Sequence, residues 1–550
     1  MNKMETNITP TTTTTNALQM EKMEVDASIN DNNNNNTNNN NNNNAFSTSS
    51  LFISFVKRRP KSTICYALIV LFVIILIATG NPVYATMFLF MYFCLLYAWE
   101  NIFRLAWLET DEERKTPIPL ICCKGKIIIK REVVCYTIWS VYLFIAFSSA
   151  TVGSRLSGSE PNAYVTFSYS ILGSMGVLFL SVTLVDIFDA LRRIITRCRN
   201  IITKKTENII IPNEKKINQL KSCLSIGIWI ILSICALANG YDKGWTIKVE
   251  VYLKKLPSCL DGFKIGLLSD MHAGVLIGKN EIAQHVAMMN EENLDIVILS
   301  GDMADGSPTV VSGALEPIIN DLKTKFGIYY STGNHEYLHG TGTAEEQGAK
   351  WEQWWEKNGV VVLHNNVTRV PSRIPYNSNC NETFDLVGVP DRGHGPKLKD
   401  TLKKTSFDPS RAKILIAHQP LEIIEAAKEK VDLQLSGHTH AGHIFPLQIL
   451  ISLSNRGYIH GLDTLDETQL YTSAGTTGWG PRTRLWSFNE RTVLTLRSGA
   501  KDNSSGDTYR TSLSIGIGLS AFVFIAFCAS CINRLCLPPI THLKNHYYTK

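Results

Sequence analysis

The sequence predicts an α/β domain joined to a helical region that crosses a membrane several times. Between residues 245 and 497, short apolar runs alternate with helix-like patterns, which is typical of α/β folds. Five longer apolar stretches precede this segment and one follows it, each close to the about 20 residues that cross the hydrocarbon core of a bilayer. Polar motifs follow the short apolar runs, at the position where α/β folds place their functional sites.

The first 50 of the 550 residues are of low complexity. A threonine run at 11–15 and asparagine tracts at 32–36 and 38–44 leave too little apolar surface to offset the entropy of ordering the chain. Residues 1–50 are therefore predicted to form a disordered tail, to which the sequence assigns no function.

A membrane region is predicted at residues 51–240, with one further span near the C-terminus. Charged residues lie at or beyond the ends of the apolar stretches, which favours membrane spans over the buried helices of a soluble domain. The expected spans are residues 64–80, 83–99, 135–152, 164–188, 224–239 and 513–532.

The loop charges predict the orientation. Lys and Arg gather before the first span, between the second and third, and between the fourth and fifth, whereas the alternate loops carry only Arg155. Cytosolic loops are rich in these residues, so the N-terminus and the basic tail at 533–550 are expected in the cytosol, and segment 245–497 in the lumen or outside the cell. Because the basic residues cluster beside the spans, the net charge of +6 argues for membrane topology and against a nucleic-acid partner.

Glycosylation sequons and cysteines agree with this orientation. Sequons begin at Asn366, Asn381 and Asn503. Of the 13 cysteines, only Cys259 and Cys380 lie between residues 241 and 512. They are able to pair in an oxidising compartment, but the sequence does not decide whether they do. No cysteines are spaced like the ligands of a zinc finger.

The globular segment is expected to contain strands separated by helices. A helix at 281–290 would place Ile282, Val286 and Met289 on one face. The expected strands are residues 263–268, 296–299, 327–330, 413–416 and 431–435. Each of them ends just before a polar motif.

The last of these motifs, Ser-Gly-His-Thr-His-Ala-Gly-His at 436–443, presents two histidines two residues apart. Together the motifs supply nitrogen and oxygen donors but no thiolate, a set that suits Mn²⁺, Fe²⁺ or Zn²⁺. The donors are too many for one tetrahedral zinc and sufficient for two ions, the arrangement with which many phosphoester hydrolases activate water. The candidate residues are Asp270, His272, Asp302, Asp305, Asn334, His335, His418, His438 and His440.

These motifs, in this order, resemble those of the calcineurin-like metallophosphoesterase superfamily over residues 247–497. The resemblance implies a four-layer α/β/β/α sandwich and two divalent metal ions. It also implies that His335 contacts the phosphoryl group or protonates the leaving oxygen, and that Asp305 pairs with His335. The sequence departs from the common pattern at Ala441 and His443, where Gly and Gln are usual. The implied ligands are Asp270, His272 and His440 for the first ion, Asp302 as the bridge, and Asn334, His418 and His438 for the second.

Taken singly, the same residues have ordinary explanations. Asp270 or Asp302 after a strand is usually a helix N-cap, and a lone His418 is usually a hydrogen-bonded core histidine. Only the ordered set favours a metal centre. Glu336 is expected to cap backbone groups rather than to bind metal. Packing is expected for Trp351, Trp354 and Trp355, and surface positions for His364, His394 and His460.

The sequence therefore predicts an integral-membrane phosphohydrolase that cleaves a phosphoester with metal-activated hydroxide and without a phospho-enzyme. Its substrate is expected near the membrane, because the linker at 241–245 is short. One alternative is a receptor or scaffold with a metal-bound, inactive ectodomain, which the intact motif set disfavours. Another is a transporter with an enzymatic appendage, which the scarcity of ionisable residues in the spans disfavours.

Overall fold

The computed structural model describes residues 94–108, 112, 115, 117–122, 125–148, 156, 158–202, 213–338, 340–371, 380–395, 398–404, 408–444 and 447–500. Several predictions lie outside the described residues. They concern the tails at 1–50 and 533–550, the spans at 64–80 and 513–532, most of the span at 83–99, and the sequon at Asn503.

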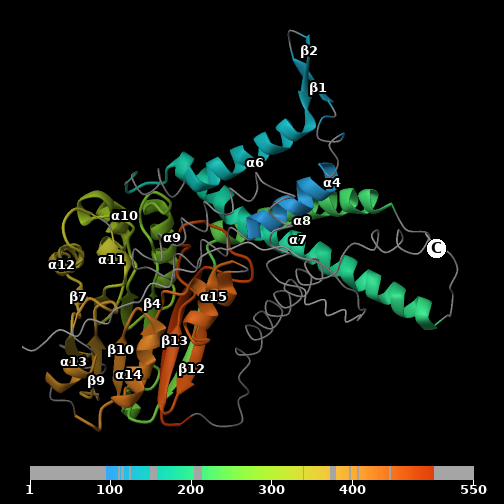
Figure 1. Ribbon diagram of the computed structural model, residues 1–550. Coiled ribbons are helices and arrows are strands. Elements are labelled where there is room, and N and C mark those ends of the chain that lie inside the picture. The colour runs from blue at the N-terminus through green and yellow to red at the C-terminus, as the bar shows by residue number, and fades with distance from the viewer. Residues whose placement is uncertain are drawn as a thin grey trace, which may run out of the picture. The chain divides into compact units, whose positions relative to one another are not determined.

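Two mixed six-stranded sheets form the α/β domain (Figure 1). In the first sheet β4 to β7 run parallel, and in the second β9, β10, β11 and β13 do. The first sheet has the order β3 (Trp245–Leu253), β14 (Glu490–Ser498), β4 (Lys264–Leu268), β5 (Ile296–Ser300), β6 (Ile328–Ser331) and β7 (Val361–Val362). The second has the order β12 (Gly461–Leu465), β13 (Thr468–Thr472), β11 (Leu433–Ser436), β10 (Lys413–Ile416), β9 (Phe384–Gly388) and β8 (Asn366–Val370).

The two sheets pack against each other through alternating side chains of their strands. Ile265 and Leu267 of β4 enter a core that also holds Ile414 of β10 and Leu435 of β11. Leu268, the next residue along β4, belongs instead to the core on the opposite face. Because both faces of these strands are buried, the strands read in the sequence as continuous apolar runs.

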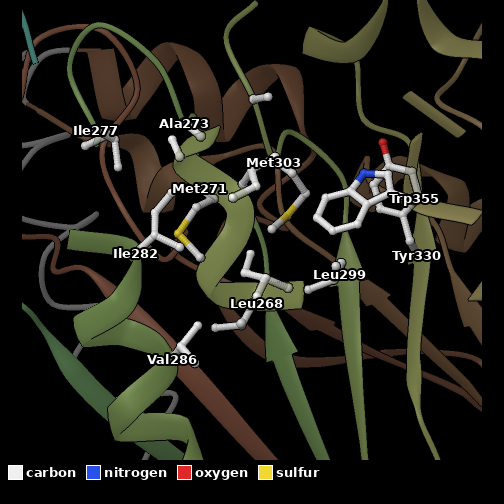
Figure 2. Close-up of a cluster of buried hydrophobic side chains, with 14 of the residues drawn as sticks. Leu268, Met271, Ala273, Ile277, Ile282, Val286, Leu299, Met303, Tyr330 and Trp355 are labelled. Carbon is white, nitrogen blue, oxygen red and sulfur yellow. The ribbon is translucent and has the colours of Figure 1, made fainter. Parts of the chain in front are cut away.

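Helices cover the outer faces of both sheets. On the first sheet α9 (Lys279–Asn290), α10 (Pro308–Asn320) and α12 (Ala344–Lys357) contribute to one core, in which Ile282 and Val286 lie near Leu268 and Trp355 near Leu299 (Figure 2). On the second sheet α13 (Leu398–Lys404) and α14 (Ile423–Lys428) contribute to a separate core against the strands. The predicted order of layers is therefore present, and the packing role predicted for Trp351 and Trp355 is confirmed.

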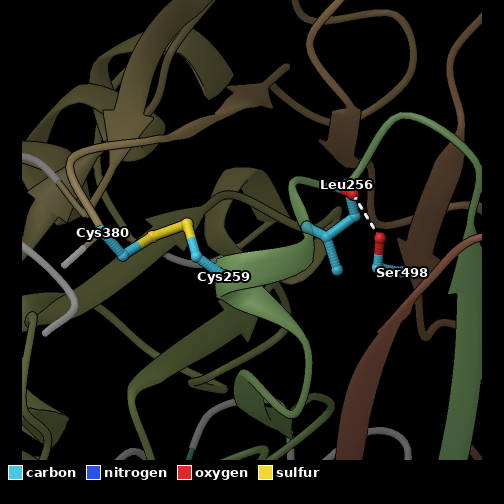
Figure 3. The surroundings of a disulfide bond; sticks show 4 residues. All are labelled: Leu256, Cys259, Cys380 and Ser498. Atoms are coloured by element: carbon cyan, nitrogen blue, oxygen red, sulfur yellow. Dashed lines mark hydrogen bonds between the residues drawn. A yellow bond between two sulfur atoms is a disulfide. The ribbon is translucent and has the colours of Figure 1, made fainter.

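A disulfide bond joins two distant parts of this domain (Figure 3). Cys259, in the short helix η3 (Ser258–Leu260), pairs with Cys380, which is 121 residues away in the sequence. Nearby, the hydroxyl of Ser498 at the end of β14 donates to the carbonyl of Leu256 at 2.7 Å. The pairing that the sequence left open is thus formed, and it ties the start of the domain to the segment before β9.

Two of the described helices are long and apolar enough to cross a membrane. They are α7 (Ala163–Ile202), in its stretch Ala163–Thr196, and α8 (Glu214–Tyr241), where the fourth and fifth spans are expected. Buried core helices of soluble proteins are sometimes equally long and apolar. Most of the apolar part of α7 is buried, whereas most of the apolar part of α8 is exposed. An indole N–H of α8, from Trp229, donates to the carbonyl of Ser174 in α7 at 3.0 Å.

The sequence predicted only some of the remaining N-terminal elements. The third expected span corresponds to α6 (Arg131–Ser148), which is preceded by a hairpin of β1 (Pro117–Cys122) and β2 (Gly125–Lys130) that the sequence did not predict. Residues 94–99 of the second expected span are described and helical, and η1 (Glu100–Arg104) and α4 (Leu105–Trp107) follow them. Basic residues expected in the loop after the fourth span lie in the last turns of α7, which continues to residue 202.

A buried histidine of α9 makes the stability of the domain depend on pH. His285 is 1% exposed, and its Nδ1 lies 2.8 Å from a guanidinium nitrogen of Arg491. Burial and the charge of Arg491 lower the pKa of His285 from 6.5 to about 3. The folded protein keeps His285 neutral where the unfolded chain takes up a proton. Its contribution to stability is therefore complete above pH 6.5 and is lost as the pH falls toward about 3.

We expect His285→Gln to remove this part of the pH dependence. Between about pH 6 and about pH 5, the variant should gain about 1.4 kcal/mol of unfolding free energy relative to the wild type. Denaturant unfolding of both proteins in the same detergent measures this difference. Subtracting the unfolding free energy of the wild type from that of the variant at each pH removes the acid sensitivity that the two proteins share. A difference that stays constant with pH would contradict the assignment.

Candidate metal centre

The predicted motifs converge at the C-terminal ends of parallel strands from both sheets. Asp270 and His272 follow β4, Asp302 and Asp305 follow β5, and the segment from Asn334 follows β6. His418 follows β10 and His438 follows β11, just before the short helix η5 (His440–Gly442). The structure places their side chains in three overlapping groups able to hold a metal ion. They are Asp270, His272 and His440; His272, Asp302 and His335; and Asp302, His418 and His438.

The first group contains two imidazoles facing one another. Nε2 of His272 lies 3.1 Å from Nε2 of His440, which is 3.4 Å from Oδ1 of Asp270. All three residues are buried. Asp270 is held in place by the hydroxyl of Ser269, at 2.5 Å, and by the backbone N–H of His438, at 2.9 Å. The orientation therefore aims three donor atoms at one point.

The third group centres on Asp302. Its Oδ2 lies 3.0 Å from Nε2 of His418, and its Oδ1 accepts from the backbone N–H of His335 at 2.8 Å. Nδ1 of His418 lies 2.8 Å from the carbonyl of Ser300, which leaves Nε2 to face the site. Asn334, which the sequence proposes as a ligand, lies beside this group. Its Oδ1 is 2.9 Å from Nδ1 of His438.

His335, which forms the remaining group with His272 and Asp302, pairs with Asp305. His335 opens α11 (His335–Leu338), and its Nδ1 lies 2.6 Å from Oδ1 of Asp305. The same oxygen is 2.9 Å from Nδ1 of His272. Burial disfavours the protonated imidazole, but Asp302 and Asp305 raise the pKa of His335 to about 9. His335 therefore carries a proton at neutral pH.

The pKa values of the other groups in the site are shifted in both directions by burial and by neighbouring charges. Burial opposes ionisation of Asp302, but His418 and His335 hold the pKa of its carboxyl well below the usual range. Burial and the charge of His418 lower the pKa of His438 to about 3, and burial lowers that of His440 well below its usual range. Burial raises the pKa of Asp270, and although burial opposes protonation of His418, Asp302 raises the pKa of His418 well above its usual range.

The backbone of the site is held in an unusual conformation. Asp270, His272, Asp302, His438 and His440 all have positive φ, between 46° and 71°. Residues other than glycine rarely adopt a positive φ. Such backbone strain persists where the surrounding structure imposes it, most often at functional sites. Glycines make the close approach possible. A Cβ on Gly437 would lie 1.9 Å from the hydroxyl oxygen of Ser269, and one on Gly333 would lie 2.3 Å from Oδ1 of Asp302.

Glu336 acts as the capping residue that the sequence predicts. Its buried carboxylate accepts from the backbone N–H groups of Asp302 at 3.0 Å, Met303 at 2.7 Å and Gly333 at 2.7 Å. These three residues belong to the loops that follow β5 and β6. Glu336 therefore fixes the two loops to each other without contacting the candidate donors with its own side chain.

Sequence reasoning missed two residues of the site. Arg484 is fully buried and donates to the carbonyl of His440 at 3.4 Å. The ring of Trp479 lies edge-on to that of His335, with centroids 5.8 Å apart. Both residues lie in the loop at 478–489, which has no strand or helix pattern and contains no histidine or acid. The sequence therefore carried no local signal for either of them.

The prediction for one isolated histidine was wrong. His460, expected at the surface, has a side chain only 19% exposed, and its Nε2 lies 2.6 Å from the buried carboxylate of Glu490. His364 is 41% exposed and pairs with Glu352, whereas His394 stacks on Tyr337 with ring centroids 3.8 Å apart. None of the three approaches the candidate donors in the groups described above.

Comparison with known proteins agrees with these motifs. A family model described as calcineurin-like phosphoesterase matches residues 263–442. The chain is similar to the transmembrane protein with metallophosphoesterase domain of Bos taurus, with 30% identity over 385 residues, which cover 67% of this chain and 82% of that protein. With the protein of the same name in Danio rerio it shares 29% identity over 354 residues, 62% and 76% of the two chains. An uncharacterized metallophosphoesterase of Helicobacter pylori is 33% identical over 283 residues, 50% and 71% of the two chains.

The bovine relative bears most directly on the family assignment, because the matched region is longer than the α/β domain and covers 82% of that protein. The family model covers the strands and loops that carry all of the candidate donors. The chain belongs to the calcineurin-like phosphoesterases, in the same family as the transmembrane protein with metallophosphoesterase domain.

Proposed function

We propose that this protein is an integral-membrane phosphohydrolase that uses two divalent metal ions. The observation that carries the proposal is the convergence of acidic and histidine side chains, most of them buried, from five strand ends. In this proposal Asp302 bridges the ions. Asp270, His272 and His440 hold the first ion, and Asn334, His418 and His438 hold the second.

The donor set fits such ions. Nε2 of His418 is buried and lies 3.0 Å from Oδ2 of Asp302, a separation that a proton or a cation between the two atoms would stabilise. The two Nε2 atoms of His272 and His440, 3.1 Å apart, also need a shared cation or one proton between them. The donors are nitrogen and oxygen only, which suits Mn²⁺, Fe²⁺ or Zn²⁺. Such ions supply a water deprotonated near neutral pH and charge neutralisation of the phosphoryl oxygens.

The residues of this chain supply the remaining chemistry. His335, whose Nδ1 lies 2.6 Å from Oδ1 of Asp305, is suited to donate a proton to the departing oxygen of the phosphoester. Asp305 also contacts His272, so that a single carboxylate orients both a proton donor and a proposed ligand. Ionised Asp302 and Asp270 beside two cations would leave the site about 2+ in charge, which favours an anionic substrate.

Metal removal tests the proposal on the full-length chain in detergent. We expect about two divalent ions per chain, with hydrolysis of bis-p-nitrophenyl phosphate or p-nitrophenyl phosphate that a chelator abolishes and added metal restores. The two rates rank diester against monoester cleavage. Two bound ions without turnover of either compound would favour the inactive receptor or scaffold. A folded chain that binds no metal would overturn the site assignment.

We propose that the catalytic domain faces the lumen or the cell exterior. The Cys259–Cys380 bond supports an oxidising compartment. The sequons at Asn366, where β8 begins, and Asn381, just before β9, have exposed asparagines.

Glycan mapping tests this orientation in eukaryotic cells. A glycosidase should increase the gel mobility of the wild type, and Asn366→Gln or Asn381→Gln should each remove part of the shift. Asn7 lies in a sequon of the expected cytosolic tail, so Asn7→Gln is the matched control and should change nothing. A shift that depends on Asn7 alone would reverse the orientation.

A further inference from the structure

One loop, residues 478–489, connects the candidate metal centre to the two long apolar helices. At the metal centre, the guanidinium of Arg484 donates to the carbonyl of His440 at 3.4 Å. The backbone N–H of Leu485 donates to the carbonyl of His443 at 3.3 Å. With Trp479 beside His335, the 478–489 loop forms one wall of the centre.

The same loop is bonded to the end of α8. Arg482 and Asn489 both donate to the carbonyl of Gly240, at 3.3 Å and 3.2 Å, and Asn489 also donates to that of Asp242 at 2.6 Å. The guanidinium of Arg482 lies 4.2 Å from the centre of the Tyr241 ring. No long spacer therefore separates the metal centre from α8.

The loop also packs closely on α7. A Cβ on Gly173 of α7 would lie 2.2 Å from the hydroxyl oxygen of Thr483, so the side chain of Thr483 packs against the helix backbone where only a glycine leaves room. A Cβ on Gly480 would lie 3.6 Å from the ring of Tyr169, in the second turn of α7. The 478–489 loop therefore lies against both long apolar helices, α7 and α8.

Large aromatic side chains are exposed along this path. Trp479 at the metal centre is 41% exposed and Phe488 near the end of the loop is 53% exposed. Tyr241 and Trp245, on either side of the junction between α8 and β3, are 43% and 64% exposed. Tryptophan and tyrosine are enriched at membrane–water interfaces, where one part of the ring system meets hydrocarbon and another meets water.

These contacts point to an amphiphilic ligand. A phosphate group would be drawn to the cationic metal centre, while an apolar chain would lie along the aromatic side chains between that centre and the ends of α7 and α8. We propose that the substrate is a phosphoester lipid, which remains in the bilayer while its headgroup reaches the centre. The inference rests on the proposed function and specifies its substrate class.

A pair of chromogenic diesters tests the inference on the full-length protein in phospholipid nanodiscs. Methyl p-nitrophenyl phosphate and hexadecyl p-nitrophenyl phosphate have the same leaving group and differ only in their alkyl chain. Because burying two or three methylenes is worth about tenfold in affinity, we expect kcat/KM for the hexadecyl ester to exceed that for the methyl ester by about tenfold or more.

Variants separate recognition of the chain from its enrichment in the nanodisc. Phe488→Ser and Trp245→Ser remove exposed rings, and each should lower the hexadecyl-to-methyl ratio about threefold or more. Val361 of β7 is also exposed, at 41%, so Val361→Ser is the matched control and should leave the ratio unchanged.

The outcomes distinguish this inference from the proposed function. Hydrolysis of the methyl ester with a ratio near one would overturn the lipid assignment while leaving the phosphohydrolase intact. A high ratio that neither variant lowers would show enrichment without recognition, and would also overturn it. Failure of the wild type, loaded with metal, to hydrolyse either ester would overturn the proposed function itself.

Discussion

Asp302→Asn should abolish phosphoester hydrolysis and reduce the metal content of the protein. Asp302, like His272, belongs to two of the three donor groups, and its oxygens face His418 on one side and the backbone of His335 on the other. An amide of the same size offers one neutral oxygen in place of two anionic ones, so it cannot bridge two cations. Even the loss of an outer-shell partner typically costs about 10–100-fold, so we expect a loss of at least about 100-fold.

The measurement combines metal analysis with turnover of p-nitrophenyl esters. We expect fewer than two ions per chain in the variant and an unchanged thermal unfolding profile once metal is removed from both proteins. Asp400→Asn, at an exposed position of α13, is the matched control and should retain full activity. An Asp302→Asn protein that keeps both ions and its turnover would refute the bridging role.

Arg484→Lys should strongly destabilise the domain although it conserves the charge. The guanidinium of Arg484 is fully buried and donates to the carbonyls of Ala474, Thr477 and Phe488 at 2.8, 2.6 and 2.8 Å, in addition to that of His440. An ammonium group donates from a single point and cannot reach carbonyls on both sides of the loop. Each buried carbonyl left unpaired costs about 1–3 kcal/mol, so we expect a loss of about 3 kcal/mol or more in unfolding free energy.

A second arginine provides the control for this change. Arg497 on β14 is 34% exposed at its side chain and pairs with Glu250 and Asp261 at the surface. Arg497→Lys should cost less than about 1 kcal/mol, because exposed ion pairs contribute little. Denaturant unfolding of both variants checks the difference. Equal effects of the two substitutions would show that the buried contacts of Arg484 do not support the loop.

The sequence predicted those parts of the site that depend on local patterns. The strands β4, β5, β6, β10 and β11 are continuous apolar runs, and parallel strands bring their C-terminal ends to one edge. Asp270, Asp302, His418 and His438 were therefore recognisable as neighbours before any coordinates were known. The capping role of Glu336 was also predictable, because a buried acid beside a turn usually accepts backbone N–H groups.

Other features depend on contacts between residues that are distant in the sequence. The bond between Cys259 and Cys380 closes a separation of 121 residues, and nothing in their spacing distinguishes a pair from two free thiols. Arg484 reaches His440 across 44 residues from a loop without periodicity. His460 appeared isolated because its partner Glu490 lies 30 residues further on, in another strand. The sequence shows such residues only as unremarkable polar side chains.

The position of β14 has a consequence for how the protein is made. It is the last strand of the domain along the chain, yet it lies between β3 and β4, the first two, and pairs with both. A ribosome therefore releases every proposed metal ligand before it releases the strand that completes their sheet. Until residue 498 has emerged, β4 presents an open edge of the kind that pairs with other chains. Chaperone protection of the nascent chain should accordingly last until synthesis of the domain is finished, and metal should be loaded only afterwards.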